Sequence, residues 1–139
     1  MRREVYSGTL KLYGEEHERT LTNATNYVSS LIRLERFEEA KSVLHKSMPL
    51  ARRVLGNSNE ITLSMKYYHA RALCEDPAAT LDDLREAVEI LESVAAVWKR
   101  VFGNAHPDTP RIQGLLAAAR KALAANAAAS SSGELSGAT

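Results

Sequence analysis

Four histidines and one cysteine are the side chains of this sequence best suited to bind a metal or attack a substrate. Their spacing does not assemble such a site. Cys74 follows His69 by five positions, which would put the two on different faces of a helix, so we expect no metal pair there. No base is visible near Cys74 to activate its thiol. Since no glycine-rich phosphate loop or HExxH motif is present either, we expect no catalytic residue, no cofactor and no bound metal, and hence no enzyme.

Two of the histidines occupy equivalent places in a repeat. Three segments of the chain share an apolar residue, a glycine, two free positions, then His or Asn, two more positions and Thr. Their glycines are Gly14, Gly56 and Gly103, separated by 42 and 47 positions. His17 and His106 stand where the second copy has Asn59, a good N-cap residue. A residue that recurs with the repeat and exchanges with another capping residue is interpreted as structural.

The second copy is longer because of one connection. Ala40 and Ala87 each precede the next glycine by 16 positions, whereas the interval from Thr20 to Ala40 is 20 and that from Thr62 to Ala87 is 25. The five extra residues therefore fall near residues 75–79. A length change confined to one turn is typical of stacked repeats.

The spacing of apolar residues predicts an all-α protein. Apolar positions recur with a helical period, and each repeat glycine can take the left-handed conformation that ends a helix. The predicted helices cover residues 18–34, 37–55, 60–74, 80–102 and 107–125. Residues 1–12 are in phase with the later part of a helix whose beginning is missing. The chain thus contains about two and a half helix pairs.

The predicted repeat domain spans residues 1–125. Residues 126–139 are mostly Ala, Ser and Gly with a single charge, and they cannot bury enough apolar surface to offset the entropy lost on ordering. We therefore expect this Ala/Ser/Gly-rich tail to be disordered.

Length and charge limit the class of partner. The 139 residues carry 18 Lys and Arg against 17 Asp and Glu, a net charge of +1, which argues against nucleic acid as a partner chosen by bulk charge. No apolar run reaches the roughly 18–20 residues that a membrane span requires, so no membrane insertion is expected. A single cysteine fits a reducing compartment. The expected location is intracellular and cytoplasmic, with an organelle left open.

The repeat resembles a known family. The residues Phe37-Glu38-Glu39-Ala40, the interval of 42 and the segment from Val101 to Thr109 look like tetratricopeptide repeats of the kinesin light chain type. The chain departs from that pattern at Glu18-Arg19 and Glu60-Ile61, which replace Pro-Asp, and at Pro49, which falls inside a predicted helix. An interior proline costs about 3 kcal/mol unless a kink absorbs it.

The resemblance implies a short α-α superhelix, a solenoid, with a concave groove for a peptide or protein. The inner wall would be formed by the first helix of each pair. Matching to the family's pattern places Thr22, Thr25, Ser29, Arg33, Ser64, Tyr67, Arg71, Arg111, Ala118 and Lys121 on this wall. Such a polar and mildly basic lining would suit an extended acidic segment, because Arg33, Arg71 and Arg111 could make charge-assisted hydrogen bonds.

Two functions remain open at this stage. The first is a non-catalytic protein–protein interaction module, a scaffold or adaptor that binds through its groove or its end faces. The second is a fixed structural subunit of a larger assembly. Because the last predicted helix has no second member, its apolar residues are expected to be covered by a partner or a second copy, as in an oligomer or larger complex. These residues are Ile112, Leu115, Leu116 and Leu123.

Overall fold

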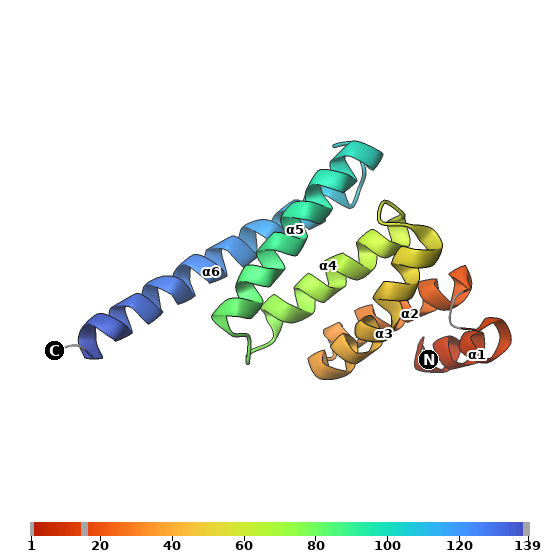
Figure 1. Ribbon diagram of the computed structural model, residues 1–139, viewed down its shortest axis with the longest axis horizontal. Helices are drawn as coiled ribbons and strands as arrows, with labels where there is room; N and C mark the ends of the chain where they lie inside the picture. The colour runs from red at the N-terminus through yellow and green to blue at the C-terminus, as the bar shows by residue number, and fades with distance from the viewer. Residues whose placement is uncertain (1, 15–16, 138–139) are drawn as a thin grey trace.

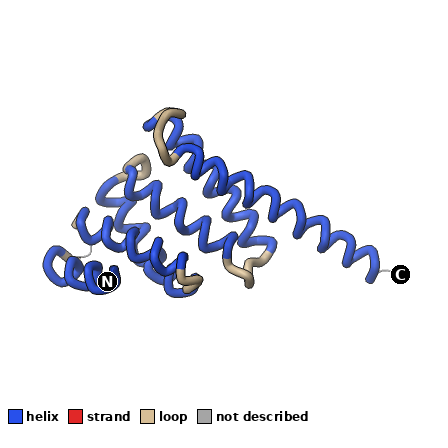
Figure 2. Tube along the Cα trace, turned by 180° about the vertical axis from the view of Figure 1, so that it is seen from behind, coloured by secondary structure: helices blue, strands red, loops and turns tan. Residues whose placement is uncertain are grey.

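A computed structural model describes residues 2–14 and 17–137, and throughout that part every regular element is a helix (Figures 1 and 2). The helices are α1 (Arg2–Tyr13), α2 (Glu18–Arg33), α3 (Phe37–Leu55), α4 (Glu60–Glu75), α5 (Leu81–Phe102) and α6 (Thr109–Gly137). The all-α prediction is confirmed. The predicted bounds of α2 to α5 agree with the structure to within one residue.

The helices stack in the order of the sequence (Figure 1). Each helix packs against the next, and α4 also contacts α2 and α6, whereas α3 and α5 do not contact each other within the part described. Helices α2, α4 and α6, called the inner helices below, therefore form one layer. Helices α3 and α5 pack against one side of this layer. This is the arrangement of a short tetratricopeptide-like superhelix, with α1 and α6 as single helices at the two ends.

Two clusters of buried side chains hold the stack together. One lies between α2, α3 and α4, and the other lies between α4, α5 and α6. The equivalent residues Leu21 and Leu63 are fully buried in the two clusters, and each contributes about 1.5–3 kcal/mol by burial. Ala40 and Ala87, the second marker of the repeat, are also fully buried, so a small residue lets neighbouring helices approach closely at the same place in each unit.

Helix α3 runs without interruption past Pro49, the position where the sequence raised the prospect of a break. The exposed ring of Pro49 leaves the carbonyl of His45 without its helical N–H donor. The buried face of the helix, formed by residues such as Leu44, Met48 and Ala51, keeps its packing on both sides of the proline. Tertiary contacts thus hold the helix through an unfavourable residue.

The expectation that a partner must cover the last helix is wrong for its main apolar residues. Ile112 and Leu116 are 4% and 8% exposed, and Leu115 and Leu123 pack against the same cluster. The reason is that α6 lays its apolar side on α5 and α4. The outward side of α6 differs from the same side of α4. In α4 this side carries the buried residues Leu63, Ala70 and Leu73. The equivalent positions of α6, 47 residues later, are exposed and carry Pro110, Ala117 and Arg120. Small or charged residues thus replace the buried leucines on this side of α6, which suits the end of a helical stack.

The first helix has a different open side. Val5 is 53% exposed, whereas its repeat equivalents Ser47 and Val94 are 3% and 1% exposed. In the two complete units, that position faces the first helix of the same pair. Within the part of the chain that the structure describes, no preceding helix packs on α1, and Val5 is exposed there.

Helix α6 continues to Gly137, through the segment in which disorder was expected, and its second half projects away from the stack (Figure 1). Alanine has the highest helix propensity of all residues, which favours continuation. The side chains of residues 124–129 are exposed, so the propensity alone sustains the helix there. The boundary of the packed domain near residue 125 stays a prediction.

The longer connection after α4 is anchored to the preceding unit. Asp76 accepts hydrogen bonds from the N–H of Ala78 (2.9 Å) and from the ammonium of Lys41 in α3 (3.1 Å). These two partners lower the pKa of Asp76 despite the opposing effect of burial. The inserted residues therefore tie the connection after α4 to helix α3 of the preceding unit through the Asp76–Lys41 contact.

We expect Asp76→Asn to lower the free energy of unfolding at pH 7 by about 0.5–1 kcal/mol. Because the pKa of Asp76 is lower in the folded than in the unfolded protein, this contribution exists above the ordinary aspartate pKa of about 4 and is lost as the pH falls below it. Urea unfolding at pH 7 and pH 2.5 measures the difference. Glu92→Gln, which removes an exposed ion pair with Arg120, is the control. Equal losses in the two variants, or a loss that is independent of pH, would contradict the tie.

Candidate functional site

The inner helices begin at capped junctions that repeat along the chain. In each junction a side chain accepts a hydrogen bond from the backbone N–H two residues later. The three bonds join His17 Nδ1 to Arg19 N (3.1 Å), Asn59 Oδ1 to Ile61 N (2.9 Å) and His106 Nδ1 to Asp108 N (3.0 Å). The predicted structural role of the two histidines is confirmed.

The threonines of the repeat fasten each inner helix to the element before it. Thr20 and Thr62 donate their hydroxyls to the carbonyls of Thr9 and Ala51, each at 3.3 Å and eleven residues earlier. Thr109 donates instead to the carbonyl of Gly103 at 3.0 Å. Junction and threonine together fix how the inner helices lie against one another, and so position the residues between them.

A cavity of about 160 Å³ opens between α2, α4 and α6. Its lining residues come from all three inner helices, from α5 and from the last junction. They are Thr25, Asn26, Leu63, Ser64, Tyr67, Tyr68, Trp98, Asp108, Arg111 and Ile112. Four of the residues expected on the groove wall are therefore brought together here, namely Thr25, Ser64, Tyr67 and Arg111.

Arg111 is held in a fixed position beside this cavity. Its Nε donates to the hydroxyl of Tyr67 at 3.2 Å and its Nη2 donates to the hydroxyl of Tyr68 at 2.7 Å. Its Cζ lies 4.7 Å and 5.5 Å from the centroids of the two rings, within the range of cation–π attraction. Burial lowers the pKa of Arg111, but the two hydroxyls more than offset this and raise it. Its Nη1 also lies 3.9 Å from the carboxylate of Asp108, which lines the cavity and offsets part of the charge. The structure thus holds a fixed guanidinium at the cavity, with one carboxylate beside it.

The other predicted wall residues lie outside the cavity. Arg71 pairs with Glu75 at 2.9 Å, so part of the expected positive charge is neutralised. Arg33 is exposed and donates to Ser30 at 3.4 Å. Lys121 is exposed on α6. Thr22 lines a separate hollow beside the first junction, and Ser29 is half-buried on α2.

Sequence reasoning did not place six of the lining residues at this cavity: Asn26, Leu63, Tyr68, Trp98, Asp108 and Ile112. Trp98 is a core residue with 2% exposure, yet it also lines the cavity, and its buried Nε1 has no hydrogen-bond partner. The doublet of adjacent tyrosines was the available signal for Tyr68. Asp108 lies in the junction before α6, where helical periodicity does not predict which way a side chain points.

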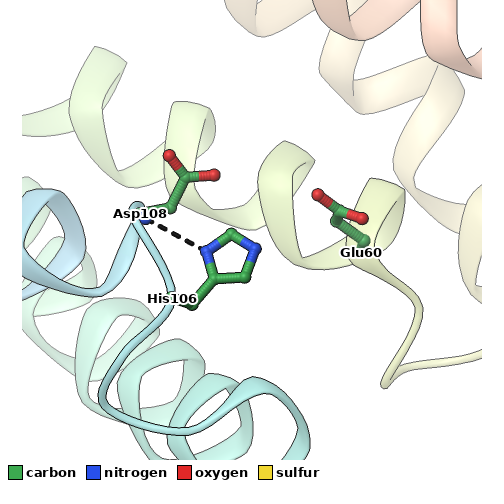
Figure 3. Close-up of side chains that lie close together, drawn as sticks. All are labelled: Glu60, His106 and Asp108. Atoms are coloured by element: carbon green, nitrogen blue, oxygen red, sulfur yellow. Dashed lines mark hydrogen bonds between the residues drawn. The ribbon is translucent and has the colours of Figure 1, made fainter.

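His106 also lies near two carboxylates, Glu60 and Asp108, with one potential ligand atom from each residue within 4.8 Å of the others (Figure 3). The hydrogen bonding does not suit a metal. Metal-bound histidines donate a proton from the ring nitrogen that does not bind the metal. Here Nδ1 accepts the N–H of Asp108, so it cannot donate a proton while Nε2 binds a metal, and its own lone pair is already used. We assign this cluster to the junction.

The remaining nucleophile candidates are not organised for catalysis. Burial, and secondarily Glu75, raises the pKa of Cys74 to about 11, so the thiol is protonated at neutral pH. His69 is half-buried, and its buried Nδ1 has no hydrogen-bond partner within the part of the chain that the structure describes. Burial lowers the pKa of His69. Neither residue lines the cavity of the inner helices.

Residues 79–108 match a family model described as tetratricopeptide repeat. The match covers α5 and the last junction, which is the part of the chain that carries the clearest repeat residues, and it supports a tetratricopeptide repeat protein. Comparison with curated proteins and with solved structures found no match. None of the helices within residues 2–14 and 17–137 has both the length and the apolar character needed to traverse a bilayer.

The raised pKa of Cys74 gives a direct test of its inertness. At pH 8 the folded protein should react with iodoacetamide at least about tenfold more slowly than the urea-unfolded protein, because thiolate is scarce and the sulfur is half-buried. Mass spectrometry of the alkylated protein over time measures both rates. A folded-state rate equal to the unfolded one would show that Cys74 is reactive and reopen the question of catalysis.

Proposed function

We propose that this protein is a non-catalytic interaction module that binds an acidic segment of a partner protein along the face of α2, α4 and α6. Tetratricopeptide repeats generally mediate protein–protein interactions, which supports the general role. The observation that carries the proposal for this face is Arg111, held on Tyr67 and Tyr68 beside a cavity.

The chemistry around Arg111 favours an acceptor-rich ligand. Both tyrosine oxygens accept from the guanidinium, so their own protons are free to be donated elsewhere. The hydroxyl of Ser64 and the unpartnered Nε1–H of Trp98 add further donors to the lining. Carboxylate oxygens accept such bonds most strongly, and a preorganised arginine loses little entropy when it binds them.

The cavity is small for a whole peptide, so it would hold one carboxylate side chain. The rest of an extended segment would lie along the inner helices, past Arg33 on α2 and Lys121 on α6. Both residues are exposed, and neither forms an ion pair within the part of the chain that the structure describes. Their charges would attract an acidic segment from a distance and would be screened by salt.

The alternative of a fixed structural subunit has less support. A permanent interface buries more than about 2,000 Å² and is more apolar than ordinary surface. Within the part described, the outward side of α6 exposes no large apolar side chain, and the open side of α1 exposes Val5 as its large apolar residue. Reversible binding through the inner face therefore fits this molecule better than burial inside an assembly.

A pair of fluorescent ten-residue peptides tests the proposal, one with three glutamates among alanine and glycine and one with glutamine in their place. The acidic peptide should bind at least about tenfold more tightly in fluorescence anisotropy, and its affinity should fall as NaCl rises. Arg111→Gln and Arg33→Glu should each weaken it by about tenfold, whereas Lys99→Glu on α5 should not.

Thermal melting of every variant separates lost binding from lost folding, since Arg111 also contacts two tyrosines. Arg33 is exposed and tests the same face without touching the core. Equal affinity for both peptides, or equal weakening by Lys99→Glu, would show that the inner face does not recognise acidic segments.

A further inference from the structure

A second depression lies on the other side of the layer of inner helices, beside α3 and α5. It has two parts, of about 720 Å³ along α3 and about 330 Å³ between α3 and α5. Met48, Arg52 and His69 line both parts and make them continuous. Since α3 and α5 do not contact each other, α4 forms the floor of the smaller part, with Lys66 and His69.

The chain departs from its own repeat at this place. Arg52 and Lys66 are separated in sequence but line the same depression. The equivalent residues are Leu10 and Ala24 in the preceding unit and Lys99 and Gln113 in the following one. Ala24 is fully buried in the core. A cation in the last turn of α3 is favourable to the helix dipole, which accounts for Arg52, but Lys66 lies in the middle of α4 and has no such reason.

The two cations lack a neutralising partner. Neither forms an ion pair in the part of the chain that the structure describes, although Glu86 and Glu89 of α5 line the same hollow. Burial, and secondarily the charge of Arg52, lowers the pKa of Lys66. By contrast, Lys41 at the far end of the depression is paired with Asp76.

A buried nitrogen lies next to this pair. His69 replaces Tyr27 and Leu116 of the other units, and its Nδ1 has no hydrogen-bond partner. The middle unit thus places three nitrogen-bearing side chains, Arg52, Lys66 and His69, around one depression. Of the three, only Arg52 has a structural reason in the repeat, namely the helix dipole of α3. Residues that depart from the repeat pattern without stabilising the fold point to a binding role.

We propose that this depression binds the phosphate group of a phosphorylated serine or threonine on a partner protein, with Arg52 and Lys66 as its cationic contacts. A phosphate monoester carries a charge of about −1.5 to −2 at neutral pH and three acceptor oxygens, so one group can satisfy both cations. Arginine presents a planar fork to two of those oxygens, and lysine adds a point charge. The larger part of the depression, with Met48 and Pro49, has room for the flanking residues of the polypeptide.

The carboxylates of α5 should affect anion binding in the opposite direction to the two cations. Glu86 and Glu89 repel an anion in the depression, so removing one of these charges strengthens binding, whereas removing Arg52 or Lys66 weakens it. Lys99 provides a matched control, because it occupies the position of Arg52 in the following unit, where Gln113 stands in place of Lys66. Lys66→Gln introduces the residue that the chain itself uses at Gln113, and Arg52 is exposed, so both variants should fold.

The experiment uses the full chain and three probes: inorganic phosphate, a seven-residue glycine and alanine peptide with a central phosphoserine, and the same peptide with serine. Amide shifts in NMR spectra report binding. The phosphopeptide should cause saturable shifts around Arg52 and Lys66, and the serine peptide should cause none. Arg52→Gln and Lys66→Gln should each weaken binding at least about fivefold, Glu89→Gln should strengthen it, and Lys99→Gln should leave it unchanged.

Three results would overturn the proposal. The first is the absence of saturable shifts with the phosphopeptide while melting temperatures are unchanged. The second is binding of inorganic phosphate alone, which would make the site an anion site without a protein ligand. The third is equal weakening by Lys99→Gln, which would reduce the effect to overall charge.

Discussion

The fold depends on a backbone conformation that recurs at three places. Gly14, Gly56 and Gly103 have φ values of 82°, 89° and 77°, and for the latter two ψ is 166° and 176°, a region that essentially only glycine occupies. Each glycine ends an outer helix and turns the chain so that the capping residue three positions later can start an inner helix. If these corners did not form, the apolar sides of successive helices would not meet, and neither buried cluster could exist.

Because the corners are equivalent, differences between the units are informative. The inner layer places Tyr67, Tyr68 and Arg111 from different units within hydrogen-bonding distance, which creates a charged and rigid point on one face. The other face places Arg52 and Lys66 where the preceding unit has Leu10 and Ala24. On the same frame we therefore propose two separate sites for negatively charged groups, one for an extended acidic segment and one for a phosphate.

The sequence was sufficient for the fold because its signals are local. Glycines, caps and the period of apolar residues define the helices, and the fixed interval of the repeat defines how they stack. The sites were harder to predict because they depend on contacts over long separations. The hydrogen bond from Arg111 to Tyr68 joins residues 43 positions apart, and a helical wheel of α4 alone directs only Tyr67 inward. The cover over Ile112 and Leu116 was missed for the same reason, since it comes from α5 and α4 and not from a missing partner.

The most direct test of the account is to replace the corner glycines by alanine and compare the result with a glycine inside a helix. A Cβ at Gly14, Gly56, Gly103 or Gly114 would meet nothing within 4 Å, so steric crowding plays no part and only the backbone conformation matters. Gly56→Ala should lower the free energy of unfolding in urea by about 1–3 kcal/mol, whereas Gly114→Ala, within α6, should raise it by up to about 1 kcal/mol. If Gly56→Ala were as stable as the parent protein, the corners would not be the constraint that the stack requires.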